Sequence, residues 1–461
     1  MHFVNREREL ARLESWWARS ERFALVWGRR RVGKTALLRR FAHDRRVVFH
    51  TGGGESPQEE LAGMSRRVAE AFPDDLRDLR SNPYVDWHDA LDHLARLAQD
   101  EPVLLVLDEF PELIIGSPAL PGILRAFWDH AQGRTKLRIL LCGSAVRTMF
   151  SIQETRAPLY GRFDLVLPVH SFRPHEAAVM LRDLPATERA FVYGLLGGMP
   201  LYLSWWDQHR PIGENLLELA CQPGARLLSE GRLILATEVG EGEHSAAVLR
   251  AIAKGRTKFS EIQDAVGINP TRVLDRLIEL RLVERVMPVT DDERSRRRIY
   301  RICDNFLAFY LGPLMRYRGE IELDLGESIL PALVNGLDDL MGAAYEEAFR
   351  EHLRRLARAG SLGPNIVAVG PWWRTGGQDQ IDAVALAEPQ RTRIPVLVGE
   401  SKWAKTANAA RLRARLFEKA ASLTTDRDDL RYAICARESI THTTPDILAV
   451  TAADIFAGAA G

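Results

Sequence analysis

The stretch Phe23–Leu38, with the sequence FALVWGRRRVGKTALL, constrains the fold of this chain more than any other. The apolar run Phe23–Trp27 predicts a buried strand, and Ala36–Leu38 opens a predicted helix. Glycines between them let the backbone bend, so that successive N–H groups and the positive end of the helix dipole face an anion. The spacing GxxxxGK[ST] in this context predicts a phosphate-binding loop. Its residues are Gly28, Arg29, Arg30, Arg31, Val32, Gly33, Lys34 and Thr35.

Two side chains of this loop have predicted chemistry of their own. Lys34 would reach the terminal phosphates of a nucleotide, and the Thr35 hydroxyl would hold Mg²⁺. ATP and Mg²⁺ are therefore the expected cofactors. The run of arginines from Arg29 to Arg31 would raise the local positive potential unless these side chains are only solvated. The alternative for the whole pattern is an ordinary glycine-rich turn with a surface lysine.

A second apolar run ends in two carboxylates. Val103–Leu107 predicts a strand that is buried on both faces of a parallel sheet, and Asp108 and Glu109 follow it. Open α/β sheets bind their ligands at this end of their strands. We expect Asp108 to join Thr35 in the Mg²⁺ shell, and Glu109 to orient and polarise the attacking water. The alternative is a solvated acidic turn.

Two further polar positions are candidates for contact with the same phosphates. Ser144 follows the predicted strand Leu137–Cys142 and would sense the terminal phosphate, with a helix cap as the alternative. Arg162 precedes the predicted strand Phe163–Leu167 and would stabilise charge in the transition state, with Arg156 as the second candidate. For each arginine the alternative is a surface position in a loop.

The composition excludes several classes of protein. A chain of 461 residues predicts two to four domains, and because 62 Lys and Arg balance 62 Asp and Glu, any nucleic-acid surface must be local. Four separated cysteines without a CxxC pair argue against a zinc ribbon or a disulfide framework. The N-terminus lacks a signal core, and no apolar run approaches the ~20 residues of a membrane span. We therefore expect a cytoplasmic protein without a membrane partner.

The order and spacing of several motifs resemble a known family. The motifs FVNRERELARL, GRRRVGKT, VLDEF, LCGSA, APLYGRF and LGGMPLYL look like those of the archaeal-type P-loop ATPases of the STAND/AAA+ radiation. The resemblance implies ATP binding and hydrolysis on a parallel sheet, with Asn5, Arg6 and Glu7 near the adenine. It also implies that the GGMP sequence at 197–200 lies in a helical lid near the nucleotide.

The part of the chain from 243 to 318 predicts a winged helix. Helical patterns at Ala246–Ala253, Ser260–Val266 and Thr271–Leu280 precede two alternating strands, Val283–Val289 and Arg297–Ile302. The second helix begins with a capping-box pattern, in which a serine is followed three residues later by a glutamine. Three helices followed by a hairpin are typical of a winged helix.

Basic residues concentrate in this predicted winged helix. Residues 245–302 hold 13 Lys and Arg against 8 Asp and Glu, although the whole chain is neutral. We expect Arg272 and Arg276 to be exposed on the last helix. The wing carries Arg294, Arg296, Arg297 and Arg298. DNA binding and a role as a lid or protein contact both stay open.

The C-terminal part contains a second candidate site. Asp382 lies in an apolar strand pattern, and the strand Ile394–Ser401 ends with Glu400 followed by Lys402. Residues two apart on a strand share a face, so Glu400 and Lys402 should point together. Asp382 and Glu400 would bind Mg²⁺, while Lys402 would position or help to deprotonate a water molecule. Glu346 on the preceding helix would complete the shell, with Glu347 as the alternative; a cross-strand ion pair is the non-catalytic explanation.

These residues also carry a resemblance. QIDAVAL followed by LVGESKW is similar to the core motif of PD-(D/E)xK, restriction-endonuclease-like domains fused to archaeal-type ATPases, with Ile381 in the place of the proline. The resemblance covers about the last 120 residues. It implies a metal-dependent nuclease fold in which Lys419 also lines the site.

The sequence therefore predicts an α/β chain with four domains. They are a P-loop NTPase parallel sheet (1–168), a helical lid (169–242), a winged helix (243–318) and a restriction-endonuclease-like α/β domain (319–461). The expected function is ATP hydrolysis that controls DNA cleavage in defence or genome maintenance. The alternatives are a non-nucleolytic signalling switch and a DNA-binding regulator. DNA, a protein partner and a homo-oligomer are all open as partners; an oligomer would be required if Arg162 acted on a neighbouring subunit.

Overall fold

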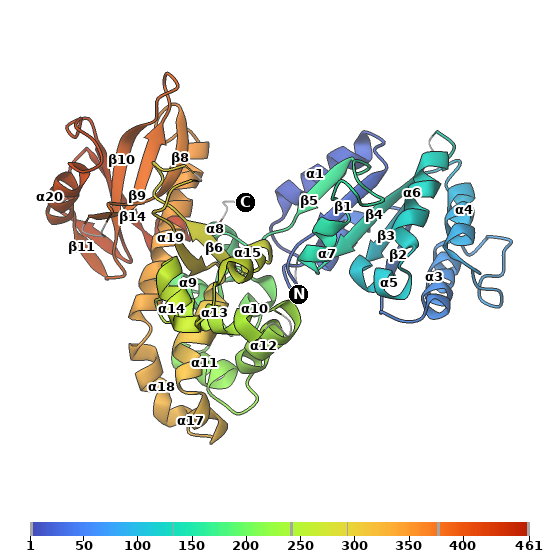
Figure 1. The fold of residues 1–461 in the computed structure, drawn as a ribbon, viewed down its shortest axis with the longest axis horizontal. Helices are drawn as coiled ribbons and strands as arrows, with labels where there is room; N and C mark the ends of the chain where they lie inside the picture. The colour runs from blue at the N-terminus through green and yellow to red at the C-terminus, as the bar shows by residue number, and fades with distance from the viewer. Residues whose placement is uncertain (1–2, 132, 240–242, 293, 376–378, 459–461) are drawn as a thin grey trace. The chain divides into compact units, whose positions relative to one another are not determined.

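The computed structural model of the protein describes residues 3–131, 133–239, 243–292, 294–375 and 379–458. The chain divides into two compact units, residues 1–170 and 171–461, drawn in Figure 1. The predicted boundaries inside the second unit stay predictions, and the first of them, at 242/243, adjoins residues 240–242, which lie outside the described residues. No helix in the described part of the chain is long and apolar enough to cross a bilayer.

The first unit is built on a five-stranded parallel sheet with the strand order β2-β3-β4-β1-β5. Its strands are β1 (Phe23–Trp27), β2 (Val47–Thr51), β3 (Val103–Asp108), β4 (Leu137–Gly143) and β5 (Leu165–Pro168). Every residue of β1, β3 and β4 is buried, as continuous apolar runs require in a sheet that is covered on both faces. Because β3, β4 and β1 are neighbours, their carboxyl ends lie together at one edge of the sheet.

Seven helices accompany this sheet among the described residues (Figure 1). They are α1 (Glu7–Ala18), α2 (Lys34–Ala42), α3 (Pro57–Ala71), α4 (Trp87–Leu97), α5 (Phe110–Gly116), α6 (Leu120–Ala131) and α7 (Val146–Ser151). Local sequence explains where α3 begins, because Ser56 and Glu59 form a capping box and Pro57 occupies the first helical position. Side chains of β1, β3 and β4 pack with those of α3, α4 and α6 in one apolar core.

The second unit begins with helices and short π-helical turns. Its helices before the hairpin are α8 (Pro174–Met180), α9 (Ala186–Leu196), α10 (Pro200–Leu203), α11 (Ile212–Ala220), α12 (Arg226–Ile234), α13 (Glu243–Ala253), α14 (Phe259–Val266) and α15 (Thr271–Glu279). Leu235–Val239 forms a π-helical turn. An antiparallel hairpin of β6 (Val283–Val286) and β7 (Ile299–Ile302) follows α15. We call residues 243–302 the helix–hairpin segment.

Further helices lead to a second sheet. They are α16 (Asn305–Phe309), the π-helical turn Tyr310–Leu314, α17 (Arg318–Glu322), α18 (Gly326–Asn335) and α19 (Asp338–Arg358). The sheet has the order β14-β12-β10-β9-β8, in which β8, β9 and β10 are antiparallel neighbours and β10, β12 and β14 are parallel. Its strands are β8 (Ile366–Trp373), β9 (Gln380–Ala387), β10 (Ile394–Ser401), β12 (Arg431–Ala436) and β14 (Ile447–Thr451).

Two short strands and two helices complete this C-terminal α/β region. They are β11 (Thr406–Asn408), β13 (Ser439–Thr441), α20 (Ala409–Ala420) and α21 (Ala452–Ile455). Apolar side chains of α19 and α21 pack on one face of the sheet, and those of α20 pack on the other. The chain is therefore a mixed α/β protein with a parallel sheet in the first unit and a separate α/β region at its C-terminal end.

Three local expectations for the helix–hairpin segment are wrong. Helix α14 begins at Phe259, so the predicted capping box does not form; instead the Glu261 carboxylate accepts the backbone N–H groups of Thr257 and Lys258. Arg272 is exposed as expected, but Arg276 is half-buried and donates to the carbonyl of Val239. The hairpin strands are shorter than predicted, and the wing beyond them makes contacts with β8 instead of a longer ladder.

One of these contacts uses a predicted wing arginine. Arg297 pairs with Asp291, and its Nη1 donates to the carbonyl oxygen of Trp373 in β8 at 2.9 Å. The backbone N–H of Val289 donates to the carbonyl of Pro371 at 2.8 Å. The wing is thus fixed to the C-terminal sheet.

We expect acid to weaken the second unit through His352 on α19. This side chain is buried, and burial together with the charge of Arg355 lowers its pKa to about 4, although Asp454 acts in the opposite direction. In the unfolded chain the imidazole titrates near 6.5. The folded state therefore favours the neutral form, and its stability is complete above pH ~6.5 and falls as the pH drops toward 4. The expected loss between pH 7.5 and 4.5 is on the order of 2 kcal/mol.

Denaturant unfolding of the wild type and of His352→Gln at both pH values measures this effect. The variant should lose less stability than the wild type over the same interval, by on the order of 2 kcal/mol. His209→Gln, which alters an exposed histidine of the same unit, should keep the wild-type pH dependence. An equal pH dependence in wild type and His352→Gln would contradict the prediction.

Candidate functional site

The predicted phosphate loop lies between β1 and α2. Gly33 has φ 90° and Arg31 has φ 70°, so the turn depends on left-handed backbone at two positions, one of them without a glycine. Gly28 must lack a side chain, because a Cβ there would lie 2.3 Å from the carbonyl oxygen of Val169. These positions shape the loop so that the first N–H groups of α2 face outward from the end of the sheet.

Lys34 is the first residue of α2 and is buried. Its Nζ donates to the carbonyl oxygens of Gly28 at 2.9 Å and Arg29 at 3.1 Å. The ammonium group therefore lies over the loop, where a phosphate chain would also lie. Among the other predicted loop residues, Arg29 is buried and Arg30 approaches Glu112 at 3.8 Å.

Thr35 of α2, the helix that follows β1, meets Asp108 at the end of β3, although β1 and β3 are not neighbours. The Thr35 hydroxyl donates to Oδ2 of Asp108 at 2.8 Å, across the end of β4. Asp108 is buried. A hydroxyl and a carboxylate beside a phosphate loop are hard oxygen donors of the type that Mg²⁺ prefers when nucleotide phosphates supply further ligands. The two residues fit the predicted Mg²⁺ role.

Glu109 and Ser144 form a second pair at the same edge. Glu109 has φ 48°, an uncommon left-handed conformation that turns its side chain out of the strand. Its Oε2 accepts the Ser144 hydroxyl at 2.8 Å and the Ser144 N–H at 3.3 Å. The carboxylate is thereby held in one orientation. A contact between Ser144 and the terminal phosphate stays a prediction.

Arg162 is placed away from these pairs. Its guanidinium pairs with Asp129 at 3.1 Å and donates to the carbonyl oxygens of Pro158 and Tyr160. Arg162 could act on the transition state, as predicted, only if its guanidinium left Asp129 and moved to the phosphates.

The contact between Arg6 and the loop is the feature that sequence reasoning missed. Arg6 is buried, and its Nη2 donates to the carbonyl oxygen of Val32 at 2.7 Å while Nη1 pairs with Glu9 at 2.9 Å. The position of Arg6 within the FVNRERELARL motif could have pointed to this residue. The resemblance of that motif implied only that Arg6 lies near the adenine, and not that it donates to the backbone of the loop.

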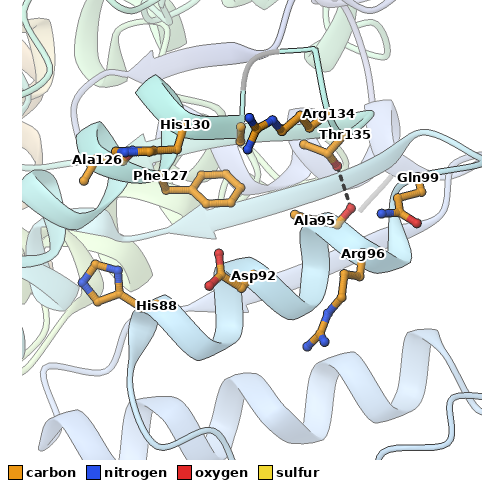
Figure 2. Close-up of a pocket in the computed structure, with 11 residues that line it drawn as sticks. His88, Asp92, Ala95, Arg96, Gln99, Ala126, Phe127, His130, Arg134 and Thr135 are labelled. Atoms are coloured by element: carbon orange, nitrogen blue, oxygen red, sulfur yellow. Dashed lines mark hydrogen bonds between the residues drawn. The ribbon is translucent and has the colours of Figure 1, made fainter.

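A separate pocket of about 480 Å³ lies between α4 and α6 in the first unit (Figure 2). Figure 2 shows His88, Asp92 and Arg96 along α4, opposite Phe127 and His130 of α6. None of the predicted nucleotide residues lines it. The pocket therefore has no part in the phosphate site.

In the second unit, the structure brings the predicted Asp382, Glu400 and Lys402 together at the ends of β9 and β10. Oδ2 of Asp382 accepts the N–H of Ser401 at 2.8 Å. The two oxygens of Glu400 pair with Nζ of Lys402 at 2.7 Å and Nζ of Lys419 at 3.2 Å. Asp382 and Glu400 are both buried. The predicted common face of Glu400 and Lys402 is formed, and Lys419 joins it.

The consecutive residues Glu346 and Glu347 on α19 have different environments. Glu347 contacts Arg301 at 2.5 Å, Arg350 at 2.9 Å and Arg354 at 2.6 Å. Burial alone would raise the pKa of Glu347, but these arginines hold it well below its usual range. Glu347 is therefore a structural ion-pair partner, and Glu346 is the better candidate of the two for chemistry.

Glu346 faces the other carboxylates. Burial, followed by the charge of Asp382, raises the pKa of Glu346 to about 7, and burial together with Glu400 raises the pKa of Asp382. Across the described ranges, no three His, Cys, Asp or Glu side chains converge as a metal-binding group. The predicted shell of Glu346, Asp382 and Glu400 is not assembled, because Glu400 is paired with two lysines. Glu346 and Asp382 fit a divalent cation, since a positive charge would relieve their repulsion.

Comparisons with known families match two separate parts of the chain. Residues 3–205 match the model of a family described as an ATPase domain predominantly from Archaea. Residues 310–413 match a family of archaeal and bacterial proteins of unknown function. The first match covers both the phosphate loop and the Asp108–Glu109 pair. The N-terminal part of the chain is thus an ATP-binding P-loop ATPase domain.

Several proteins are similar to this chain over most of its length. An uncharacterized protein of Methanocaldococcus jannaschii is 24% identical over 443 residues, which cover 95% of this chain and 96% of the relative. A Walker-type ATPase of Pyrococcus abyssi shares the fold, with a TM-score of 0.53, 22% identity, and coverage of 67% of this chain and 96% of that one. The ORC2 protein of Aeropyrum pernix, solved as ADPNP–ADP complexes, gives a TM-score of 0.40 with 15% identity, 72% coverage of this chain and 96% of its own.

Proposed function

We propose that this chain hydrolyses ATP with Mg²⁺ and that its nucleotide state controls a metal-dependent DNA nuclease at the C-terminal site. The observation that carries the ATPase part is the pair of contacts at one sheet edge, Thr35 with Asp108 and Glu109 with Ser144. The first supplies oxygen donors for a cation, and the second fixes a carboxylate beside them. Together with the lysine of the loop they form a hydrolytic arrangement and not only a nucleotide-holding one.

In the ATPase step, the loop N–H groups bind the phosphate chain. The Lys34 ammonium group, which donates to the carbonyl oxygens of Gly28 and Arg29 in this structure, donates to phosphate oxygens when ATP binds. Its charge therefore reaches the phosphates without a large movement of the backbone. Mg²⁺, when held by Thr35 and Asp108, supplies positive charge to the phosphate oxygens. Glu109 accepts a hydrogen bond from the attacking water and polarises it, while Ser144 keeps the carboxylate in place.

In the nuclease step, Asp382 and Glu346 are the proposed ligands of a divalent cation, which would stabilise charge on the scissile phosphate. Lys402 is a positioning cation and not a base: burial would lower its pKa, but the hydrogen bond and charge of Glu400 outweigh burial and raise it. Its ammonium group therefore stays protonated and can orient the phosphate or the attacking water. Glu400 holds Lys402 at 2.7 Å and would join the metal shell only by releasing a lysine.

The proposed coupling runs through the helix–hairpin segment, which we propose is a winged helix that follows a helical lid at 169–242. Arg301 of β7 pairs both with Glu284 of β6 and with Glu347 of α19. Glu346 is the next residue of the same helix. A change in the position of the hairpin would therefore act directly on a proposed metal ligand.

We expect plasmid DNA to be nicked by the full-length protein in the presence of Mg²⁺ or Mn²⁺, with a rate that depends on ATP. Asp382→Ala and Lys402→Ala should each lower the rate by about a hundredfold or more, because each removes charge stabilisation from the phosphate. Lys405→Ala is the matched control, since Lys405 is exposed and its Nζ lies 4.0 Å from Glu438, away from the proposed ligands. Agarose-gel conversion of supercoiled to open circular plasmid measures the rate. Nicking that survives both active-site changes would come from a contaminant and would refute the nuclease assignment.

A second function is favoured by the two lysines on Glu400. If these pairs are permanent, the C-terminal site is an ion-pair network in a non-nucleolytic switch that docks a partner or regulates DNA binding. In that case no nucleic acid would be cut with either metal, while ATP would still change the protease sensitivity of the second unit.

A further inference from the structure

A large cavity in the second unit connects the helix–hairpin segment with the C-terminal sheet. Its volume is about 1060 Å³, and its walls come from the start of α14, from α15, the β6–β7 hairpin and α19, and from the adjoining ends of β8 and β9. Figure 1 shows β6 beside α15 and α19. The contacts of the wing with Pro371 and Trp373 hold these walls together. We call this cavity the wing channel.

The charge of the wing channel is strongly positive. Eight Lys and Arg side chains line it, against two acidic ones, Asp275 and Glu346. Since the chain as a whole has a formal net charge of zero, this is a local concentration of positive charge.

Some of these basic side chains form ion pairs or hydrogen bonds that hold the structure together, and others do not. Arg297, Arg301 and Arg350 hold the walls of the wing channel together through their carboxylate or carbonyl partners. By contrast, Arg296 is exposed and Arg298 is half-buried, and neither forms an ion pair with a carboxylate of the described residues. These two arginines can therefore meet an anion without loss of an existing ion pair.

One end of the wing channel lies at the proposed nuclease site. Glu346 is part of its lining, and Arg350, the next basic residue along α19, donates to the carbonyl oxygen of Asp382 at 2.7 Å. An anion that entered past the wing would thus be led to the two carboxylates that fit a divalent cation.

Three aromatic side chains line the wing channel. Tyr300 is buried, whereas Phe259 and Trp373 are half-buried and therefore partly accessible. The neighbouring Trp372 is different, because its side chain packs into the core behind the sheet. Accessible aromatic faces beside cationic groups are the features with which proteins bind single-stranded nucleic acid, since every base can stack on them.

We propose that the wing channel binds single-stranded nucleic acid and leads it to the site of Glu346 and Asp382. Phosphates contact Arg296 and Arg298, and bases stack on Trp373 and Phe259. This inference rests on the proposed nuclease function and specifies the substrate form for that site.

Binding of a labelled twelve-nucleotide oligothymidylate to the full-length protein tests the inference, with fluorescence anisotropy as the readout. EDTA prevents cleavage, so binding is measured independently of nuclease activity. The double variant Arg296→Ala/Arg298→Ala should bind at least tenfold more weakly and should lower the slope of log K against log salt by about 1.4, as expected for two lost phosphate contacts. Arg294→Ala is the matched control, because Arg294 is an exposed arginine of the same wing that does not line the wing channel.

An oligonucleotide with abasic sites tests the stacking. The wild type should prefer the thymine-bearing strand at least about fivefold, Trp373→Ala should lose this preference, and Trp373→Phe should keep it. Tighter binding of a duplex than of the single strand would overturn the proposal. So would equal affinities of the double variant and the wild type, or an equal loss in Arg294→Ala.

The two proposals fail in different ways. If the binding pattern holds but neither plasmid nor single-stranded circular DNA is ever cut, the wing channel stands and the nuclease assignment falls. If plasmid is cut but the double variant binds and cuts like the wild type, the nuclease stands and the wing channel is rejected.

Discussion

Replacing Lys34 with alanine should abolish ATP binding and turnover. The ammonium group of Lys34 is the buried cation of the loop, and it is already positioned by the carbonyl oxygens of Gly28 and Arg29. Its removal takes away a charge-assisted contact to the terminal phosphates and leaves two carbonyl oxygens pointing at them. We expect turnover to fall by a hundred- to a thousandfold, on the order of the loss seen when one donor to a developing oxyanion is deleted.

Binding of a fluorescent ATP analogue and release of inorganic phosphate measure the two parts of this effect. Lys136→Ala serves as the control, because Lys136 is an exposed lysine of the same unit. Turnover by Lys34→Ala at the wild-type rate would contradict the assignment of the loop as the catalytic phosphate site.

Glu109→Gln should separate binding from hydrolysis. The amide keeps the size of the side chain and can still accept a hydrogen bond from the Ser144 hydroxyl, which lies at 2.8 Å in the wild type. It cannot polarise a water molecule as a carboxylate does. We expect ATP affinity within about threefold of wild type and a loss of turnover of 10²- to 10⁴-fold, the range for removal of a general base.

The same two assays apply, and single-turnover phosphate release distinguishes slow chemistry from slow product release. Glu101→Gln is the control, since Glu101 is exposed just before the opposite end of β3. A variant that loses binding and turnover equally would place Glu109 in nucleotide binding and not in the chemical step.

The sequence was sufficient for the bounds of two strands. The bounds of β10 are the predicted ones, although its first three residues are exposed or half-buried. The bounds of β1 are also the predicted ones, because a continuous apolar run is typical of a strand that is buried on both faces. The Asp108–Glu109 pair could be placed at the strand end for the same reason. Its consequence, a hydrogen bond from Thr35 across β4, follows from the strand order.

Contacts between distant side chains could not be predicted in this way. Arg301 lies 46 residues before Glu347, and no local pattern selects Glu347 over Glu346 as its partner. The hydrogen bond from Ser144 to Glu109 depends on the left-handed backbone conformation of Glu109, which no sequence pattern predicts. Likewise, the sequence did not show that Arg297, one of the predicted DNA-binding arginines, would instead hold the wing to β8 through the carbonyl oxygen of Trp373.

The adjacent glutamates of α19 have a consequence for how this helix can vary. Consecutive helical residues point about 100° apart, so one register of α19 directs Glu347 to its three arginines and Glu346 to Asp382. An insertion or deletion of a single residue in the preceding turn would rotate both glutamates by this angle. Glu347 would lose its contact with Arg301 of β7, although Arg350 and Arg354 of the same helix would turn with it, and Glu346 would no longer face Asp382. The helix therefore tolerates substitution on its surface but not a change of length before this point.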